Sequence, residues 1–326
     1  MSDIIGALVS FGYGKETVRG TAVAPTKWLG RYDFSFIPKS DKVLNESAYN
    51  HLSKNSGLAT LREYGEGEVT AKIFDKAIGD FFAMVVGQAP TSGAVSGQAG
   101  AYDHTFTLLN TNMHQSYTLA VQEGDVIDSR YPEAMLNSLA LEFAVDDYAK
   151  MTAGFISAKG ATATNTPAFT SENEFEPSHA TLKVVAMGGD LDAAAVLADV
   201  KSASIEINKN LLRKETLGNR SVSPRNGRME ITGEIELFYN ATTFRDYWKN
   251  NTKLALRLKV ENNEVTIGVS TKPSLTIDLP FMMIENWEPD YGNDDLIPQT
   301  LSIHGFYNAA TGGFVNLKVR NTQAAY

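Results

Sequence analysis

Hydrophobic and polar residues alternate along much of this chain. The clearest runs lie at residues 116–122, 139–143, 202–208 and 274–279, where every second side chain is apolar. Side chains two residues apart in a β-strand point to the same face, so each run has one apolar and one polar face. This alternation is typical of half-buried strands in antiparallel sheets. The chain is therefore predicted to be mainly β.

Only three segments have the spacing of apolar residues that predicts a helix. Residues 75–86 begin with Asp75, a candidate N-cap. Residues 241–250 form the second segment, and the third, residues 190–200, is rich in alanine. The apolar faces expected on the first two helices comprise Ile78, Phe81, Phe82, Phe244, Tyr247 and Trp248.

Parts of the sequence recur in the same order. Residues 67–69 (Gly-Glu-Val) return as residues 233–235 (Gly-Glu-Ile), and residues 78–82 resemble residues 244–248, both 166 positions later. Three looser matches pair residues 34–36 with 205–207, 116–119 with 274–277, and 139–155 with 301–314. A shared order of this kind indicates a tandem duplication.

The duplication predicts two domains, at residues 1–172 and 173–326. The boundary lies near residues 159–167, which are rich in alanine and threonine and non-periodic, as exposed linkers are. Residues 87–100, rich in glycine, alanine and serine, are predicted to form a mobile loop within the first domain.

Each half carries a long polar segment before its main helix, at residues 38–60 and 209–228. Structureless loops longer than about 12–15 residues are uncommon and usually functional. The two segments are interpreted as repeated contact arms, with solvated surface loops as the alternative. Their candidate contact residues are Lys39, Lys42, Lys54, Arg213, Lys214, Arg220, Arg225 and Arg228.

The strand that follows each polar segment has one polar, acid-rich face. The residues on these faces are Glu66, Glu68, Thr70 and Lys72 in the first half and Glu230, Thr232, Glu234 and Glu236 in the second. Such a face either meets bulk solvent or forms a repeated wall around an aqueous space. The sequence leaves both interpretations open.

Composition restricts the function. The chain has 326 residues, about two domains at roughly 150 residues each. It is 43% hydrophobic and 21% charged, with a net charge of −9. An acidic chain is not a general nucleic-acid binder, because duplex binding depends on basic residues. No stretch approaches the roughly 18 apolar residues of a membrane helix, and the first residues lack a signal-peptide pattern, so a cytoplasmic origin is expected.

No motif for catalysis, metal binding or cofactor binding stands out. The absence of cysteine excludes disulfides, thiolate metal sites and a cysteine nucleophile. Asp125 with Asp128 and Asp146 with Asp147 are the only candidate carboxylate pairs, and neighbours in a strand point to opposite faces. Residues 288–295 hold oxygen ligands that calcium favours but lack EF-hand spacing, which favours an Asp/Asn-rich turn.

Three segments resemble the tail tube proteins of tailed bacteriophages with long non-contractile tails. Residues 14–25, Gly-Lys-Glu-Thr-Val-Arg-Gly-Thr-Ala-Val-Ala-Pro, look like the opening segment of that family, and residues 138–143 and 152–155 are similar to its closing strands. The resemblance implies β-sandwich or partial-barrel domains, each flanked by a short helix and bearing a long loop arm. It implies a structural protein of the virion tail, assembled in the host cytoplasm, rather than an enzyme.

The resemblance also implies partners. Stacked rings of this chain would form the tube, either as trimers with pseudo-sixfold symmetry or as hexamers. Tape-measure, tail terminator and distal tail proteins would bind it, and DNA would pass during genome ejection without specific binding. An acidic lumen would repel phosphate, the basic arms would contact the next ring, and neither a cofactor nor a membrane would be involved.

Two other functions remain as alternatives. A host- or carbohydrate-binding β-sandwich module of a phage particle would need an exposed aromatic platform, but Trp28, Trp248 and Trp287 do not cluster in the sequence. A hydrolase would need paired acids, and no acidic pair occurs at matching places in the two halves.

Overall fold

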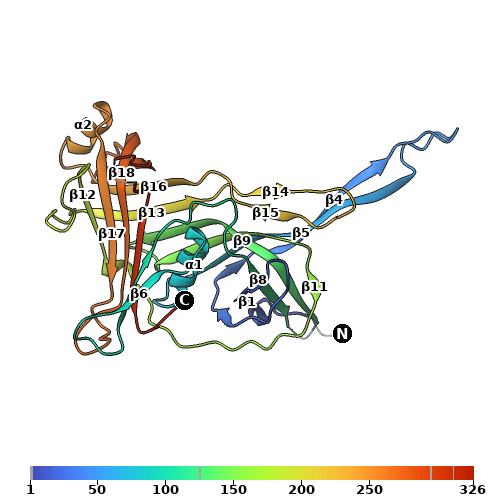
Figure 1. Cartoon of the computed structure of the whole chain (residues 1–326). Coiled ribbons are helices and arrows are strands. Elements are labelled where there is room, and N and C mark those ends of the chain that lie inside the picture. Colours follow the sequence, from blue (N-terminus) through green and yellow to red (C-terminus); the bar gives the residue numbers. More distant parts are fainter. Residues whose placement is uncertain (1–2, 125, 294–295, 311) are drawn as a thin grey trace.

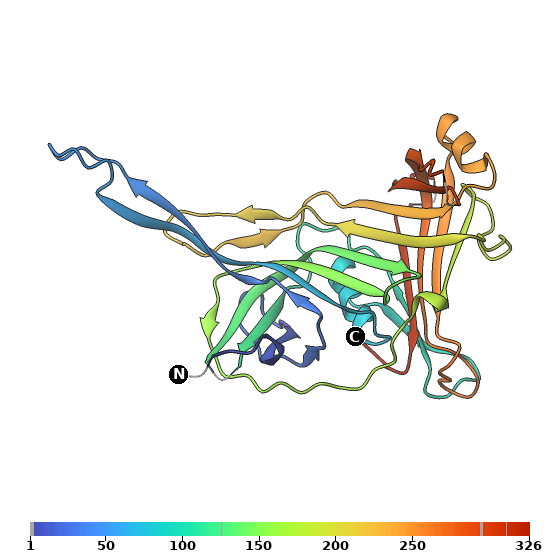
Figure 2. The same cartoon turned by 180° about the vertical axis from the view of Figure 1, so that it is seen from behind.

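The computed structural model describes residues 3–124, 126–293, 296–310 and 312–326 as two β-rich halves lying side by side, with one hairpin projecting from them (Figures 1 and 2). The first half contains β1 (Val9–Lys15), β2 (Lys27–Leu29), β3 (Asp33–Phe34), β4 (Ile37–Asn45), β5 (Gly57–Lys72), α1 (Ala77–Val86), β6 (Thr91–Ala94), β7 (Tyr102–Phe106), β8 (Tyr117–Glu123), β9 (Ile127–Ala144), β10 (Lys150–Ser157) and β11 (Ala161–Thr162). The second half contains β12 (Ala180–Ala186), β13 (Val200–Asn208), β14 (Leu212–Lys214), β15 (Ser223–Arg225), β16 (Glu230–Phe238), α2 (Thr243–Lys249), β17 (Leu254–Glu261), β18 (Ser274–Pro289), β19 (Pro298–Gly305) and β20 (Asn316–Asn321).

A single antiparallel sheet runs through both halves. Its strands follow the order β4, β5, β10, β9, β13, β16, β19 and β18, and this set is called the central sheet. The two halves meet within it, where β9 pairs with β13. The prediction of a mainly β protein is confirmed.

The pairing order of the first half recurs in the second. In the first half β1, β8, β9, β10, β5 and β4 pair in that order, and in the second β12, β17, β18, β19, β16 and β13 do the same. Bulges also recur: β9 shifts register on β10 between Leu136 and Ser138, and β18 shifts on β19 between Ile284 and Asn286. A bulge bends its strand, and beyond it β9 pairs with β8 and β18 pairs with β17.

Strand pairing corrects part of the sequence comparison. The two matches at a spacing of 166 fall on β5 with β16 and on α1 with α2, which hold equivalent places. By pairing, however, Phe34 corresponds to Ala203 and not to Ile205. The other two looser matches join β8 to β18 and β9 to β19, which are not equivalent strands. Period-two alternation makes any two strands look alike, which explains these three mismatches.

The two halves exchange segments. The hairpin β6–β7 of the first half extends the second half's sheet, because β7 pairs with β20. In return, the C-terminal Tyr326 packs on α1, where an added Cβ at Gly79 would lie only 2.1 Å from its ring. The Tyr326 hydroxyl donates to the Lys76 carbonyl oxygen (2.9 Å). Residues 87–100, predicted to be a mobile loop, thus include a paired strand.

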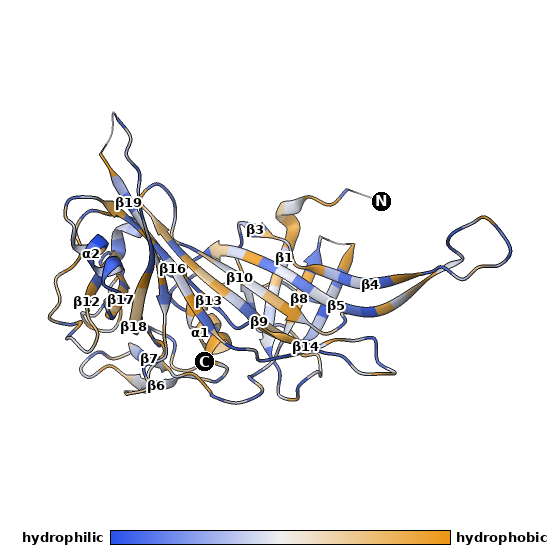
Figure 3. Cartoon of the chain, turned by 90° about the horizontal axis from the view of Figure 1, so that it is seen from above, coloured by the Kyte–Doolittle hydropathy of each residue, from blue (hydrophilic) through white to orange (hydrophobic). Residues whose placement is uncertain are grey.

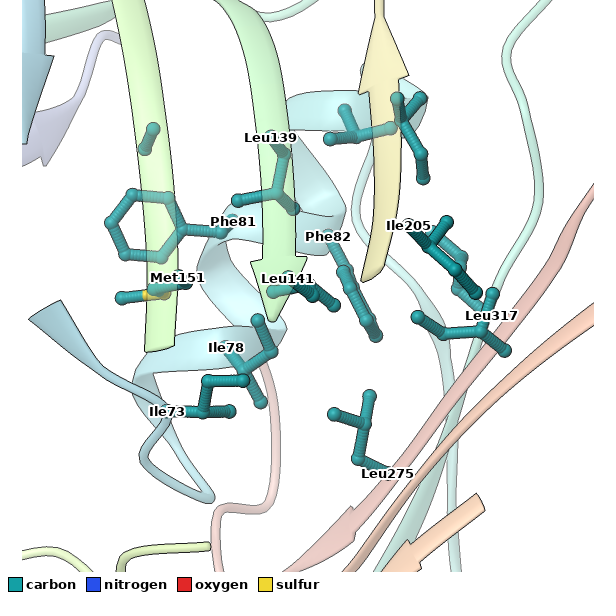
Figure 4. Packing of buried hydrophobic residues seen from close by; sticks show 14 of the residues in the cluster. Ile73, Ile78, Phe81, Phe82, Leu139, Leu141, Met151, Ile205, Leu275 and Leu317 are labelled. Atoms are coloured by element: carbon teal, nitrogen blue, oxygen red, sulfur yellow. The ribbon is translucent and has the colours of Figure 1, made fainter. Parts of the chain in front are cut away.

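Helix α1 forms the centre of the core (Figure 4). Phe81 and Phe82 are fully buried, and Leu139 of β9 and Ile205 of β13 belong to the same cluster. Fully burying one such side chain contributes roughly 1.5–3 kcal/mol. The core therefore spans both halves and fixes one face of the central sheet against the helix.

The ends of α1 are satisfied by distant residues. Glu172 Oε2 accepts the Ala77 amide (2.7 Å), in place of the predicted N-cap Asp75. At the other end Gly87 adopts the left-handed conformation (φ 83°) and donates its amide to Ala83. Lys209 Nζ donates to the Met84 carbonyl oxygen (3.0 Å).

Three other predictions need correction. Residues 190–200 are not a helix: they form turns, the Leu197 amide donates to Leu182, and Asp199 has a φ of 64°. Alanine content alone does not overcome such tertiary pairing. Residues 38–60 and 209–228 are not structureless, because each contains a β-hairpin. Asp125 and Asp294–Asp295, which belong to the candidate acidic sites, lie outside the described residues.

The burial of Lys209 against the end of α1 can be tested by its effect on stability. Its side chain is 3% exposed, and burial, together with the charge of Arg19, lowers its pKa to about 7. Between pH 7 and its ordinary pKa of 10.5, the unfolded chain therefore holds a proton that the folded chain lacks, so stability rises with pH. The free energy of unfolding of the wild type should therefore rise relative to that of Lys209→Met by up to about 1.4 kcal/mol per pH unit. Urea unfolding from pH 7 to 10 measures this difference. A difference independent of pH would contradict a buried neutral lysine.

Candidate functional site: an acidic sheet face and two arms

The central sheet has one covered face and one bare face (Figure 3). Along β5, Val69 and Ala71 point into the core. The predicted residues that alternate with them point away from it. Along β16, Ile231, Ile235 and Leu237 are likewise buried. The bare face, here called the polar face, carries all eight residues predicted from the alternation: Glu66, Glu68, Thr70, Lys72, Glu230, Thr232, Glu234 and Glu236.

Cross-strand pairing brings the two predicted sets onto one continuous surface. Thr70 lies opposite Thr152 of β10, with 3.0 Å between their hydroxyl oxygens. The same row continues through Ala140, Glu206 and Thr232 on β9, β13 and β16. Residues directly opposite in a sheet share a face, so the strands between β5 and β16 extend the polar face.

Sequence reasoning missed part of this face. Glu142, Glu206 and His304 also lie on it, at polar positions of alternating strands. The signal was present, because Glu142 and Glu206 alternate with buried Leu141 and Ile205. Only the pairing of β9 with β13 shows that these acids extend the face across both halves.

Some of the acids on the polar face are neutralised within the chain. Glu66 pairs with Arg213 (2.7 Å) and Glu236 with Lys201 (2.6 Å). Lys72 pairs with Glu174 (2.6 Å). Within the described part of the chain, Glu68, Glu142, Glu206 and Glu234 form no ion pair, so the face keeps a net negative charge.

Two hairpins leave the central sheet in the same direction (Figure 1). Arm 1 (residues 40–63) consists of the outer parts of β4 and β5 and the turn between them. Arm 2 (residues 209–229) connects β13 with β16 and contains β14 and β15. Arm 2 lies along the first half, whereas arm 1 extends beyond it (Figure 2).

Arm 2 is fixed to the first half by polar contacts. Glu133 of β9, held at a φ of 55°, accepts from Ser223 and from Arg225 (3.1 Å). Arg19 also donates to Glu133 (2.7 Å) and to the Pro224 carbonyl oxygen (2.6 Å). Burial opposes ionisation of Glu133, but these hydrogen bonds outweigh it and lower its pKa. The carboxylate therefore stays charged and holds the base of arm 2.

The opening segment, residues 14–25, positions Glu133. Glu16 is 3% exposed, and it accepts the Gly20 amide (2.8 Å) and the Glu133 amide (2.7 Å). It also accepts the hydroxyls of Ser116 (2.6 Å) and Thr118 (2.9 Å). A buried carboxylate with four donors fixes its surroundings rigidly, so the motif holds the bend of β9 that carries Glu133.

The predicted arm cations divide into two groups. Arg213 and Arg225 are held by Glu66 and Glu133 inside the chain. The exposed members are Lys39, Lys42, Lys54, Lys214, Arg220 and Arg228, of which Lys54 has an ion-pair partner, Glu46, 3.4 Å away. The exposed group is available to a partner.

The tryptophans separated in sequence come together in part. Trp248 of α2 stacks on Trp287 of β18 with ring centroids 6.1 Å apart. Their indole N–H groups donate to the Glu285 carbonyl oxygen (3.2 Å) and to Gln299 (2.8 Å). Both rings are part-buried, so they pack α2 onto β18 and form no open aromatic platform.

The described residues contain no helix long and apolar enough to cross a membrane. They also contain no group of three or more histidine, aspartate or glutamate side chains placed to hold a metal ion.

Comparison with known proteins gives the family. No curated protein matches the chain. Among solved structures, the NMR ensemble of the SPP1 tail tube, determined together with cryo-electron microscopy, is similar at 13% identity, covers 44% of this chain and 77% of its own, and has a TM-score of 0.31. The family model for phage tail tube proteins matches residues 6–305, nearly the whole chain. The chain therefore belongs to the phage tail tube protein family.

Proposed function

We propose that three copies of this chain close into a ring of six similar domains, and that these rings stack into a phage tail tube with the polar face lining the lumen. The observation that carries the proposal is the junction of β9 with β13, which joins two equivalent halves in one sheet. The same junction between copies would continue the sheet around a ring. Repeated heterologous contacts of this kind close when the rotation allows.

The open edges of the central sheet correspond to the two sides of that junction. β18 holds the place of β9, and β4 with the residues before it holds the place of β13. A shared detail supports the second assignment: Ser35 Oγ accepts the Glu68 amide (3.0 Å), as Ser204 Oγ accepts the Glu234 amide (3.2 Å). Within the described residues, neither outer edge has a strand partner.

The internal junction also gives a register. Inside the chain Ala140 lies opposite Glu206. Glu288 holds the place of Ala140, because each lies opposite a threonine of the next strand. Ile37, opposite Glu66, holds the place of Glu206, opposite Thr232. Ile37 of one copy is therefore proposed to lie opposite Glu288 of the next.

Proline residues protect both edges before assembly. Because Ser35 donates its amide to β5 (2.9 Å), Pro38 lies at a position that faces outward. Asp290 donates to β19 (3.0 Å), so Pro289 also faces outward. A proline removes a donor from an edge and weakens random pairing. Each edge then needs a matched partner.

The register predicts a specific disulfide. Ile37→Cys with Glu288→Cys should link neighbouring copies and give covalent trimers on non-reducing gels after assembly. The chain has no cysteine of its own, so the background is clean. Ala140→Cys with Glu206→Cys is the matched control and should link within one chain, leaving a monomer. Absence of the intermolecular link in assembled protein would contradict the register.

An acidic lumen would keep DNA from adhering during passage. Phosphate and carboxylate repel within a Debye length of about 8–10 Å at physiological salt. Reversing Glu68 and Glu234, which hold equivalent places, to lysine should make assembled tubes retain duplex DNA at low salt and slow genome ejection several-fold. Filter binding and a dye-release assay measure the two effects. Asp190→Lys with Glu264→Lys is the control, with equal charge change off the face, and equal DNA retention by both variants would exclude a lumen position.

The exposed arm cations are proposed to contact an acidic surface on the next ring. Complementary charge fixes register and partner choice more than affinity. Lys214→Glu, Arg220→Glu and Arg228→Glu together should leave folded rings that fail to stack, as seen by negative-stain electron microscopy. The matched triple Lys183→Glu, Lys272→Glu and Lys318→Glu changes charge away from the arms and should still give tubes. Normal tubes from the arm variant would remove this role.

A further inference from the structure

A partly exposed aromatic patch lies at one end of β18 and β19. It comprises Phe281, Met283, Phe306 and Tyr307. The rings of Phe281 and Phe306 are 5.1 Å apart, and Phe306 and Tyr307 are 37% and 61% exposed. Adjacent exposed aromatic residues usually mark a contact surface. Met283 lies opposite His304, and the ring of His304 is 5.1 Å from that of Phe306, so the patch adjoins the polar face at His304.

The equivalent place in the first half is covered. Met135 lies opposite Ile156, as Met283 lies opposite His304, so β9 and β18 align residue for residue here. Pro132 and Pro280 precede the two sites at the same spacing. By this alignment the places of Phe281, Met283, Phe306 and Tyr307 are held in the first half by Glu133, Met135, Ala158 and Lys159.

Arm 2 supplies the cover in the first half. Met135 is 1% exposed and Ala158 7%, and β15 lies against both β9 and β10. Val222, next to β15, is only 1% exposed. The Lys159 amide donates to Ser221 Oγ (3.0 Å). The place held by these four residues in each half is here called the seat. Arm 2 occupies the seat of the first half, and no segment of the described chain occupies that of the second half.

Arm 1 has the same hairpin register as arm 2. Leu44 lies opposite Leu58 in arm 1, and Arg213 lies opposite Pro224 in arm 2. Leu58 and Pro224 are 166 residues apart, which is the spacing that relates β5 to β16, so Leu58 of arm 1 corresponds to Pro224 of arm 2. Arm 1 therefore has the backbone needed to occupy an equivalent seat.

The two arms differ in polarity as their seats do. Arm 2 offers Ser223 and Arg225 to Glu133. Arm 1 has Gly57 and Ala59 at those two places, and the aromatic patch has Phe281 at the place of Glu133. The two strands of arm 1 also expose four large apolar side chains by 47–60%, namely Val43, Leu44, Leu58 and Leu61. The polar arm lies on a polar seat, and the apolar arm matches the apolar seat.

We propose that the aromatic patch is the seat for arm 1 of the neighbouring copy in the same ring. The inference rests on the proposed ring and names the partner of this surface, a second copy of this chain. The direction of the arms agrees, since arm 1 points past the first half along the course of arm 2 (Figures 1 and 2). The leucines of arm 1 would then leave water on assembly, which would stabilise the ring.

A cysteine pair tests the seat directly. Gly57→Cys with Phe281→Cys in assembled protein should give covalent trimers, because each copy links to the next around one ring. Ser223→Cys with Glu133→Cys holds the equivalent places inside the chain and should remain a monomer on the same gel. Products larger than trimers would place arm 1 on another ring and overturn the proposal.

A second variant avoids dependence on disulfide geometry. Leu58→Asp changes a side chain that is 60% exposed, so the monomer should keep its circular dichroism spectrum and melting temperature. Its assembly should need at least ten-fold more protein, measured by light scattering. Val269→Asp, at a position 70% exposed in the loop before β18, is the matched control and should assemble as wild type.

The outcomes separate this proposal from the ring itself. If the pair Ile37→Cys and Glu288→Cys gives trimers but Gly57→Cys and Phe281→Cys does not, the ring stands and the seat is wrong. Assembly of Leu58→Asp at wild-type concentration would also reject the seat. If neither pair links copies, the ring proposal fails and the seat fails with it.

Discussion

The main-chain groups along the two outer edges of the central sheet are the constraint on which the rest of the structure depends. An exposed edge presents unpaired N–H and C=O groups that pair with water or with another strand. Inside the chain, β13 satisfies the edge of β9 over residues 138–144. The outer edges of β4 and β18 have no such partner among the described residues. The proposed ring of copies would satisfy them with a contact that the chain already contains.

The polar face follows from the same sheet. The core around α1 occupies one side, so alternation places every second side chain of β5 and β16 on the other. Those positions are free to carry charge, and they carry an excess of acid. Closing the sheet would turn this face into a wall around water, where uncompensated carboxylates repel a polyanion.

Alternation and helical spacing were enough to predict the β fold, α1, α2 and the eight residues on the polar face, because local periodicity determines which side chains share a face. They could not predict the pairing of β9 with β13, or the return of Tyr326 to α1, since both depend on contacts between residues far apart. The same limit explains the mismatched strands in the repeat and the hairpins read as loops. Glu142 and Glu206 were visible as alternating acids but gained meaning only from their cross-strand neighbours.

Negative-stain electron microscopy of the purified chain over a concentration series tests the central claim most directly. End-on views of rings should show threefold symmetry with six similar densities, because two equivalent halves alternate around the ring, and side views should show hollow stacked tubes. Rings of six complete chains, or monomers alone at every concentration and in the presence of preformed tube ends, would contradict the account.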